Sequence, residues 1–210
     1  MIDYALTRTV EPAAAILPDA RIWDHLRVET SGSPAEPEDK ALIDVYREAA
    51  TSVLDGADGI LGRALITQTW QMKLPSFPCK LDPIHRDRRI VLPLPPLQSV
   101  TSITYFDSAG DEQTLATSVY SVLTRGMEKG AIVPAYGQSW PATRARADAV
   151  TVTFVAGYGN SSDDIPAAIR AAALLLIGDL YEGRTETEVG ITVQPTGAVQ
   201  RLLMPHRIPF

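Results

Sequence analysis

The sequence predicts an α+β protein: a helical bundle, built from N-terminal helices and one long C-terminal helix, with a small antiparallel β-sheet or sandwich inserted into it. Two patterns lead to this prediction. Apolar residues recur every three or four positions in residues 38–61 and 166–183, as in helices. Between these segments apolar and polar residues alternate, as in strands buried on one side. Residues 184–210 follow neither pattern, and we expect an extended C-terminal arm there.

The N-terminal part, residues 1–63, is predicted to contain two helices. Residues 18–26 place Ile22, Trp23 and Leu26 on one face of a short helix. Residues 38–61 form a longer helix, whose single apolar stripe is expected to face the core: Leu42, Val45, Ala49, Val53, Ala57 and Ile60. The stretch ETSGSPAEPEDK at 29–40 reads as an exposed connector rather than an interaction tail, because it is rich in Pro, Ser, Gly and Glu.

Residues 64–156 are predicted to form the inserted antiparallel β region. Strict alternation predicts a strand at 66–74, and another at 150–154. A hairpin is expected at 100–115, with Gly110 supplying the positive φ of its turn. Shorter strands are expected within the sequence RRIVLPLP and at 120–123 and 131–133.

Residues 157–183 are predicted to complete the helical part. Gly157 and Gly159 end the last strand, and Ser162, Asp163 or Asp164 can cap a helix that begins near Pro166. One apolar stripe of this helix comprises Ile165, Ile169, Ala172, Leu176 and Leu180, and further apolar residues lie outside it. Such a helix is buried on more than one face, which favours a protein that works by assembly.

The composition narrows the class of protein. The 210 residues are 45% hydrophobic and 21% charged, with a formal charge of −6 from 19 basic and 25 acidic residues. The excess of acidic residues argues against a protein that binds DNA tightly through clustered Lys and Arg side chains. It does not exclude a surface past which DNA moves. The basic run DPIHRDRR at 82–89 can touch a phosphate backbone, but its two aspartates favour an exposed loop.

The sequence also bears on compartment and membrane. The single Cys79 forms no internal disulfide and fits a reducing compartment. The N-terminus lacks the features of a signal peptide, and no apolar run approaches the roughly 20 residues that span a membrane. We therefore expect a protein made in the cytoplasm, without a membrane partner.

No catalytic or metal-binding constellation stands out. His25, His85 and His206 show no metal-ligand spacing, and Cys79 has no histidine near it in the sequence. Asp163 and Asp164 can act as a metal or acid–base pair, but adjacent acids before a helix are more often caps. The chain has neither a phosphate-binding glycine motif nor a nucleophile elbow. We therefore predict that the protein is not an enzyme and carries no cofactor or metal.

The order of segments resembles the head–tail connector (adaptor) proteins of long-tailed bacteriophages and of phage-like gene transfer agents. The resemblance covers nearly the whole chain, and its collinear order is more specific than any one motif. Its segments are HLRVE at 25–29, the helix containing EDKALIDVYREAA, GRALITQTW at 62–70, LPLPPLQSVTSITYFDSAGDEQTL at 92–115, VTFVAGYG at 152–159, the helix at 166–183 and LLMPHR at 202–207. His206 stands where the family pattern has an aromatic residue before the arginine.

The resemblance implies a ring, usually of twelve subunits, docked under the portal at the head–tail interface of a virion or phage-like particle and made in the bacterial cytoplasm. The ring extends the DNA channel without binding double-stranded DNA specifically, and it is a platform for a stopper or tail-terminator protein. The implied portal-binding residues of the arm are Arg201, Leu202, Leu203, Pro205, Arg207 and Phe210. The resemblance, together with the apolar surface of the helix at 166–183, implies that this helix packs between subunits. The implied packing residues are Ile169, Leu174, Leu175, Ile177 and Tyr181.

The sequence is also compatible with two other functions. A tail-side component, either a stopper or a tail terminator, would contact tail proteins instead of the portal. A small enzyme would need a pocket of converging polar groups, for which the sequence nominates no residues.

Overall fold

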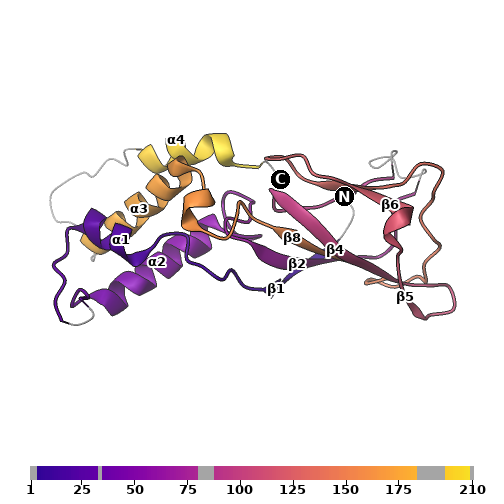
Figure 1. The fold of residues 1–210 in the computed structure, drawn as a ribbon, viewed down its shortest axis with the longest axis horizontal. Helices are drawn as coiled ribbons and strands as arrows, with labels where there is room; N and C mark the ends of the chain where they lie inside the picture. The colour runs from indigo at the N-terminus through magenta and orange to yellow at the C-terminus, as the bar shows by residue number, and fades with distance from the viewer. Residues whose placement is uncertain (1–3, 33–34, 80–87, 184–196, 209–210) are drawn as a thin grey trace. The chain divides into compact units, whose positions relative to one another are not determined.

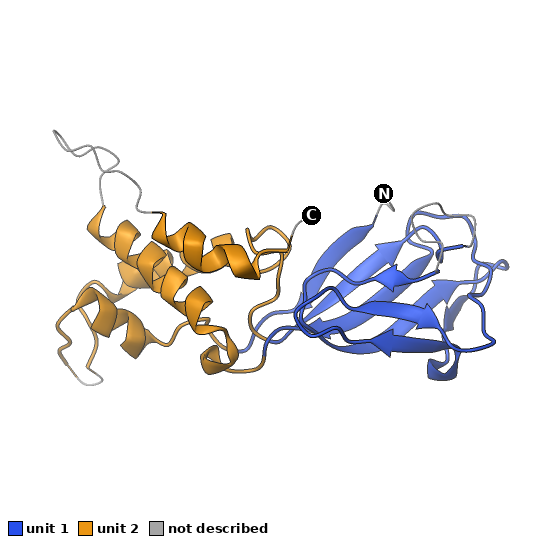
Figure 2. Cartoon of the chain, turned by 90° about the horizontal axis from the view of Figure 1, so that it is seen from above, with its two compact units in different colours: residues 1–13, 67–158 blue, residues 14–66, 159–210 orange. Residues whose placement is uncertain are grey.

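The computed structural model describes residues 4–32, 35–79, 88–183 and 197–208. Over these ranges the chain has four α-helices and two antiparallel sheets, which confirms the predicted α+β class (Figure 1). It divides into two compact units, drawn in different colours in Figure 2. The sheet unit takes residues 1–13 and 67–158, and the helical unit takes residues 14–66 and 159–210. No described helix is long and apolar enough to cross a membrane.

The larger sheet of the sheet unit is wholly antiparallel, with the order β1-β2-β8-β4-β5. Its strands are β1 (Ala5–Val10), β2 (Gln68–Leu74), β4 (Leu97–Phe106), β5 (Glu112–Thr114) and β8 (Val150–Ala156). Along β2 and β8 every second residue is buried, and Trp70 lies opposite Phe154 across the pair. The predicted period of two is therefore confirmed, and this face of the sheet carries much of the unit's core.

The smaller sheet has the order β3-β7-β6. Its strands are β3 (Ile90–Val91), β6 (Tyr120–Leu123), which follows the 3₁₀ turn η1 (Thr117–Val119), and β7 (Ala131–Pro134). The predicted hairpin is confirmed as β4 and β5, with Gly110 at φ 100° in its turn. The Asp107 carboxylate accepts the N–H groups of Ala109, Gly110 and Asp111 in that turn. These bonds, led by that of Asp111, lower the pKa of Asp107.

Strand β1 corrects the prediction that residues 1–63 contain only helices and connections. Ala5–Val10 pairs with β2 at the edge of the larger sheet, with a bulge between Arg8 and Val10. Five of its six residues are exposed and Leu6 is half-buried. A strand with neither side buried needs no alternation of apolar residues, so the usual signal is missing.

The helical unit is arranged around α3. Its helices are α1 (Asp19–Leu26), α2 (Lys40–Leu54), α3 (Ala167–Glu182) and α4 (Ala198–Leu203), with the 3₁₀ turns η2 (Ser162–Asp164) and η3 (Met204–His206). Helix α3 contacts α1, α2 and α4, and it buries Ile169, Ala172, Ala173 and Ile177. The position of α3 among the other helices can be followed in Figure 1. The predicted helices at 18–26 and 166–183 are therefore confirmed.

Helix α2 differs from its prediction in length and in its buried face. It ends at Leu54 instead of continuing to residue 61. Its buried residues are Ile43, Ala50 and Leu54, whereas Val45 and Val53 of the predicted stripe are 57% and 42% exposed. Small and apolar residues occupy several sides of α2, so periodicity alone chose the wrong stripe.

The early end of α2 has a clear cause in the loop that follows it. The buried Asp55 carboxylate accepts the N–H of Leu65 at 2.7 Å, and the N–H of Gly56 donates to the carbonyl of Arg63 at 2.8 Å. A side chain at Gly59 would lie only 2.7 Å from the backbone of Leu54 and Asp55. The loop therefore folds tightly on itself and the helix cannot continue.

The buried face of α3 predicts a contrast between two alanine substitutions. Ile177 is fully buried, so Ile177→Ala should lower the free energy of unfolding of the helical unit by about 2–5 kcal/mol. Leu180→Ala is the matched control on the same helix, and because Leu180 is 39% exposed it should cost under about 1 kcal/mol. Urea unfolding followed by circular dichroism at 222 nm measures both. Equal losses for the two variants would contradict the packing described here.

Candidate functional site: a groove beside the C-terminal helix

The C-terminal segment is folded where the sequence predicts an extended arm. Residues 198–206 form α4 and η3, and Leu203 is buried. Gly197, at φ 62°, leads the chain into α4. The N–H of Ile208 donates to the carbonyl of Leu61 at 3.0 Å, and the guanidinium of Arg63 donates to the carbonyl of His206. The extended-arm prediction is wrong for these residues, and residues 184–196 and 209–210 lie outside the described part.

A groove of about 760 Å³ lies between this segment and the loop that follows α2. The described residues that line it belong to the helical unit: Ile60, Leu61, Gly197, Val199, Gln200, Arg201, Leu203, Met204 and Arg207. Leu61 and Leu203 are buried, while Ile60 and Met204 are 42% and 79% exposed. The groove therefore presents apolar side chains to solvent.

Two arginines give the groove its charge. Arg201 and Arg207 are exposed, and among the described residues neither guanidinium has an ion-pair partner. Four other described cations of the helical unit are engaged: Arg21 and Arg170 with Asp163, Lys40 with Glu36, and Arg47 with Asp19 and Asp44. Arg27 is a further exposed arginine without an ion pair among the described residues. The unit carries nine basic and sixteen acidic residues. The groove is thus a positively charged region of a unit whose net charge is negative.

The residues that the resemblance implies for portal binding fall into three groups. Arg201, Leu203 and Arg207 line the groove, although Leu203 does so as a buried residue. Leu202 is half-buried and Pro205 is exposed, and neither lines the groove. Phe210 lies outside the described residues. Sequence reasoning missed Ile60 and Leu61, because it placed them in the predicted continuation of α2.

The residues implied for subunit packing divide into two groups. Ile169 and Ile177 lie in the core of the helical unit, so in this structure they offer no surface to a neighbour. Leu174, Leu175 and Tyr181 are half-buried. The hydroxyl of Tyr181 donates to the Asp39 carboxylate at 3.0 Å, which ties α3 to the start of α2. Part of the apolar surplus of α3 is therefore used within the chain.

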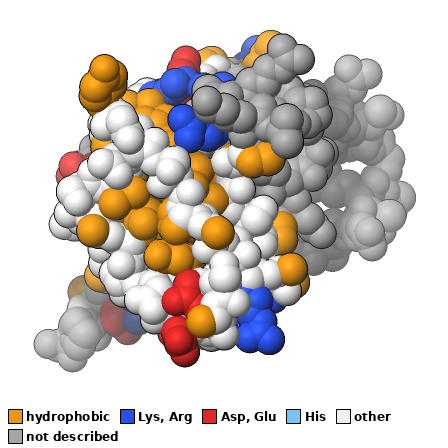
Figure 3. All heavy atoms as spheres, turned by 90° about the vertical axis from the view of Figure 1, so that its right-hand side faces the viewer, with side chains coloured by type: hydrophobic (Ala, Val, Ile, Leu, Met, Phe, Trp, Pro, Cys, Tyr) orange, Lys and Arg blue, Asp and Glu red, His pale blue; other side chains and the backbone are white. Residues whose placement is uncertain are grey.

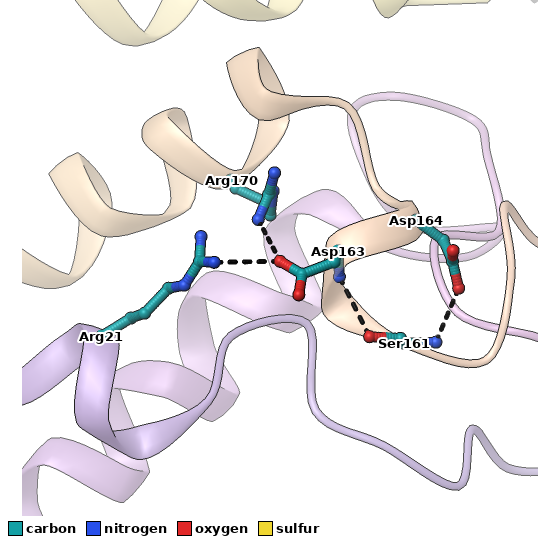
Figure 4. Close-up of polar contacts among 5 residues, drawn as sticks. All are labelled: Arg21, Ser161, Asp163, Asp164 and Arg170. Atoms are coloured by element: carbon teal, nitrogen blue, oxygen red, sulfur yellow. Dashed lines mark hydrogen bonds and ion pairs between the residues drawn. The ribbon is translucent and has the colours of Figure 1, made fainter.

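The acid pair before α3 has a structural role (Figure 4). Asp164 accepts the N–H of Ser161 at 2.9 Å, and the Ser161 hydroxyl accepts the N–H of Asp163 at 3.2 Å, which forms a capping box around η2. Asp163 accepts hydrogen bonds from Arg21 at 3.0 Å and Arg170 at 2.6 Å. The predicted cap of the long helix is not formed, because α3 has Pro166 as its N-cap without a side-chain hydrogen bond, and Asp164 instead belongs to the capping box of η2. Among the described residues, no cluster of His, Cys, Asp and Glu fits a metal ion.

The sheet unit has its own aromatic cluster. The ring of Phe77 stacks on Trp140 at 4.9 Å between centroids, and the Trp140 N–H donates to the carbonyl of Arg88 at 2.7 Å. A pocket of about 410 Å³ lies beside this pair and includes the exposed Cys79. The described lining of this pocket holds no histidine or carboxylate beside Cys79.

Figure 3 views the end of the sheet unit that carries β5 and β6, where apolar side chains gather with charged ones at the edges.

His206 adds a titrating group to the C-terminal segment. It is half-buried in η3, and its carbonyl is held by Arg63. Burial, and then the nearby guanidinium of Arg63, lower the pKa of His206, because both disfavour its charged form. The folded state therefore favours the neutral imidazole.

Comparison with solved structures shows that nearly the whole chain shares its fold with chains of gene transfer agent particles. No protein-family model matches it. No curated protein matches it. A chain in the virion of the native gene transfer agent (GTA) particle is 24% identical, with a TM-score of 0.74 over 98% of this chain and 96% of that chain. Chains in the neck of the empty GTA particle computed with C6 symmetry and of the native particle computed with C12 symmetry are 23% and 22% identical. Their TM-scores are 0.75 and 0.70, with the same coverage.

The depressed pKa of His206 predicts a pH dependence of stability. Below the usual histidine pKa of about 6.5 the unfolded chain binds the proton that the folded chain resists. The contribution of His206 is therefore fully present above about pH 6.5 and decreases as the pH falls toward the folded-state pKa. His206→Asn should lose less stability than the wild type between pH 7.5 and 5.5 in urea unfolding. Identical losses of stability in the two proteins would contradict His206 as the origin of this pH dependence.

Proposed function

We propose that this protein is a structural component of the neck of a phage-like particle, either a gene transfer agent or a tailed phage, at the head–tail interface. One observation carries the proposal: the likeness to GTA neck chains extends over 98% of this chain and 96% of those chains. The structural use of Asp163 and Asp164 is also in keeping with a protein that is not an enzyme.

Within the neck we propose the adaptor role. The protein forms a ring of twelve subunits, extends the DNA channel, and provides the platform for a stopper or tail-terminator protein. The C12 and C6 symmetry of the neck reconstructions supports a cyclic assembly. Leu174, Leu175 and Tyr181 remain the proposed packing residues, and the negative net charge suits a channel wall that does not hold DNA.

We propose that the ring binds the portal through the segment that begins at Arg201 and includes Leu202, Pro205, Arg207 and Phe210. Burial of Leu203 orders the part from 197 to 208 against its own unit. A surface that is already folded pays less ordering entropy on binding than a free arm. Because α4 also covers α3, deletion of the segment would damage the helical unit, so point substitutions are the cleaner probes.

Co-expression with the portal protein of the same particle tests this role. We expect the two proteins to purify together, native mass spectrometry to count twelve copies of this chain per portal ring, and crosslinks to join the portal to the helical unit. Crosslinks only to a stopper or tail terminator would favour the tail-side alternative. A monomer that never purifies with the portal would overturn the adaptor proposal.

A further inference from the structure

We propose that the groove beside α4 receives a short segment of the portal protein that combines apolar side chains with carboxylates. This inference rests on the proposed function, and it reverses the expected geometry of the contact. Residues 197–208 are not a free hook that enters the portal. They form one wall of a receptor, and the portal supplies the inserted segment.

The size of the groove favours a short segment. Pockets of about 300–1,000 Å³ enclose a drug-sized ligand, which is comparable to a few side chains, and the groove measures about 760 Å³. The face of a whole neighbouring subunit needs about 800 Å² from each partner, spread over some 20–30 residues. Nine of the described residues line the groove. It therefore suits an inserted segment better than the main interface between two copies of this chain.

The apolar lining of the groove indicates which side chains the inserted segment should carry. Ile60 and Met204 leave apolar surface exposed to water, above the buried Leu61 and Leu203. Docking of an apolar side chain here removes both partners from water. The inserted segment should therefore bring at least one apolar anchor.

The charge of the groove adds the second requirement. The guanidinium groups of Arg201 and Arg207 have no ion-pair partner among the described residues, and a guanidinium can bind a carboxylate through two parallel hydrogen bonds. The helical unit as a whole carries more acidic than basic residues, so its net charge disfavours the approach of an acidic segment away from the groove. Attraction at the groove and repulsion around it together make the contact specific.

Both walls of the groove are fixed before any partner arrives. The loop after α2 supplies Ile60 and Leu61, and the C-terminal segment supplies the remaining residues. The bond from Arg63 to the carbonyl of His206 joins these walls across 143 positions of sequence, and the bond from Ile208 to Leu61 adds a second tie. A preformed groove loses little entropy on binding.

Charge reversal tests the assignment with a matched control. The double variant Arg201→Glu/Arg207→Glu changes two exposed groups and should fold normally, which circular dichroism verifies. Its affinity for the purified portal ring should fall by about tenfold or more, while its own ring assembly is unchanged. Arg27→Glu is the control, because Arg27 is an exposed arginine of the same unit without an ion pair among the described residues. Its affinity should stay within about twofold of the wild type.

A second pair of variants identifies the inserted segment. Arg201→Lys/Arg207→Lys keeps both charges and supplies primary amines. A carbodiimide then joins such an amine to a carboxylate in direct contact, forming an amide while the reagent takes up the water that is lost. Mass spectrometry of the complex should find these lysines linked to an acidic, apolar portal peptide. Arg27→Lys should give no such link.

The outcomes separate the inference from the function on which it rests. Unchanged portal binding by Arg201→Glu/Arg207→Glu would overturn the groove assignment and leave the portal contact standing. Links from the new lysines to another copy of this chain would assign the groove to the ring interface instead. Failure of the wild-type protein to bind the portal would overturn both proposals.

Discussion

The helical unit depends on the covering of α3, whose apolar residues extend almost all the way round the helix. Such a helix is stable in water only when neighbours cover several of its sides. Helices α1 and α2 contact it, and α4 packs on it as well. The contact with α4 brings the C-terminal segment back onto its own unit and creates the groove. A packing requirement in one helix therefore determines the form of the candidate site.

Burial decides which elements of this chain can be predicted from the sequence and which cannot. Strands β2 and β8 lie with one side in the core, so burial imposes a period of two on their residues. Strand β1 is exposed on both sides and carries no such pattern, and only its pairing with β2 makes it a strand. In α2 the local pattern allows more than one stripe, and packing selects Ile43, Ala50 and Leu54. Periodicity identifies a helix more reliably than it identifies the buried side.

The candidate site is less predictable because its walls come from distant parts of the chain. The resemblance implies Arg201, Leu203 and Arg207 as portal-binding residues of an extended arm, whereas in the structure they line a groove that the sequence does not predict. The role of the two arginines depends on their having no ion-pair partner among the described residues, which follows from tertiary structure. Ile60 joins them only because the buried Asp55 and the tight loop after it end α2 at Leu54. No local sequence pattern records such a combination.

A cryo-electron microscopy map of the particle that contains this protein tests the neck assignment most directly. The account predicts a ring of this chain at the joint between head and tail, with a portal segment in the groove beside Arg201 and Arg207. A map that places the chain in the capsid wall or at the tail tip would contradict the account, as would particles that lack the chain.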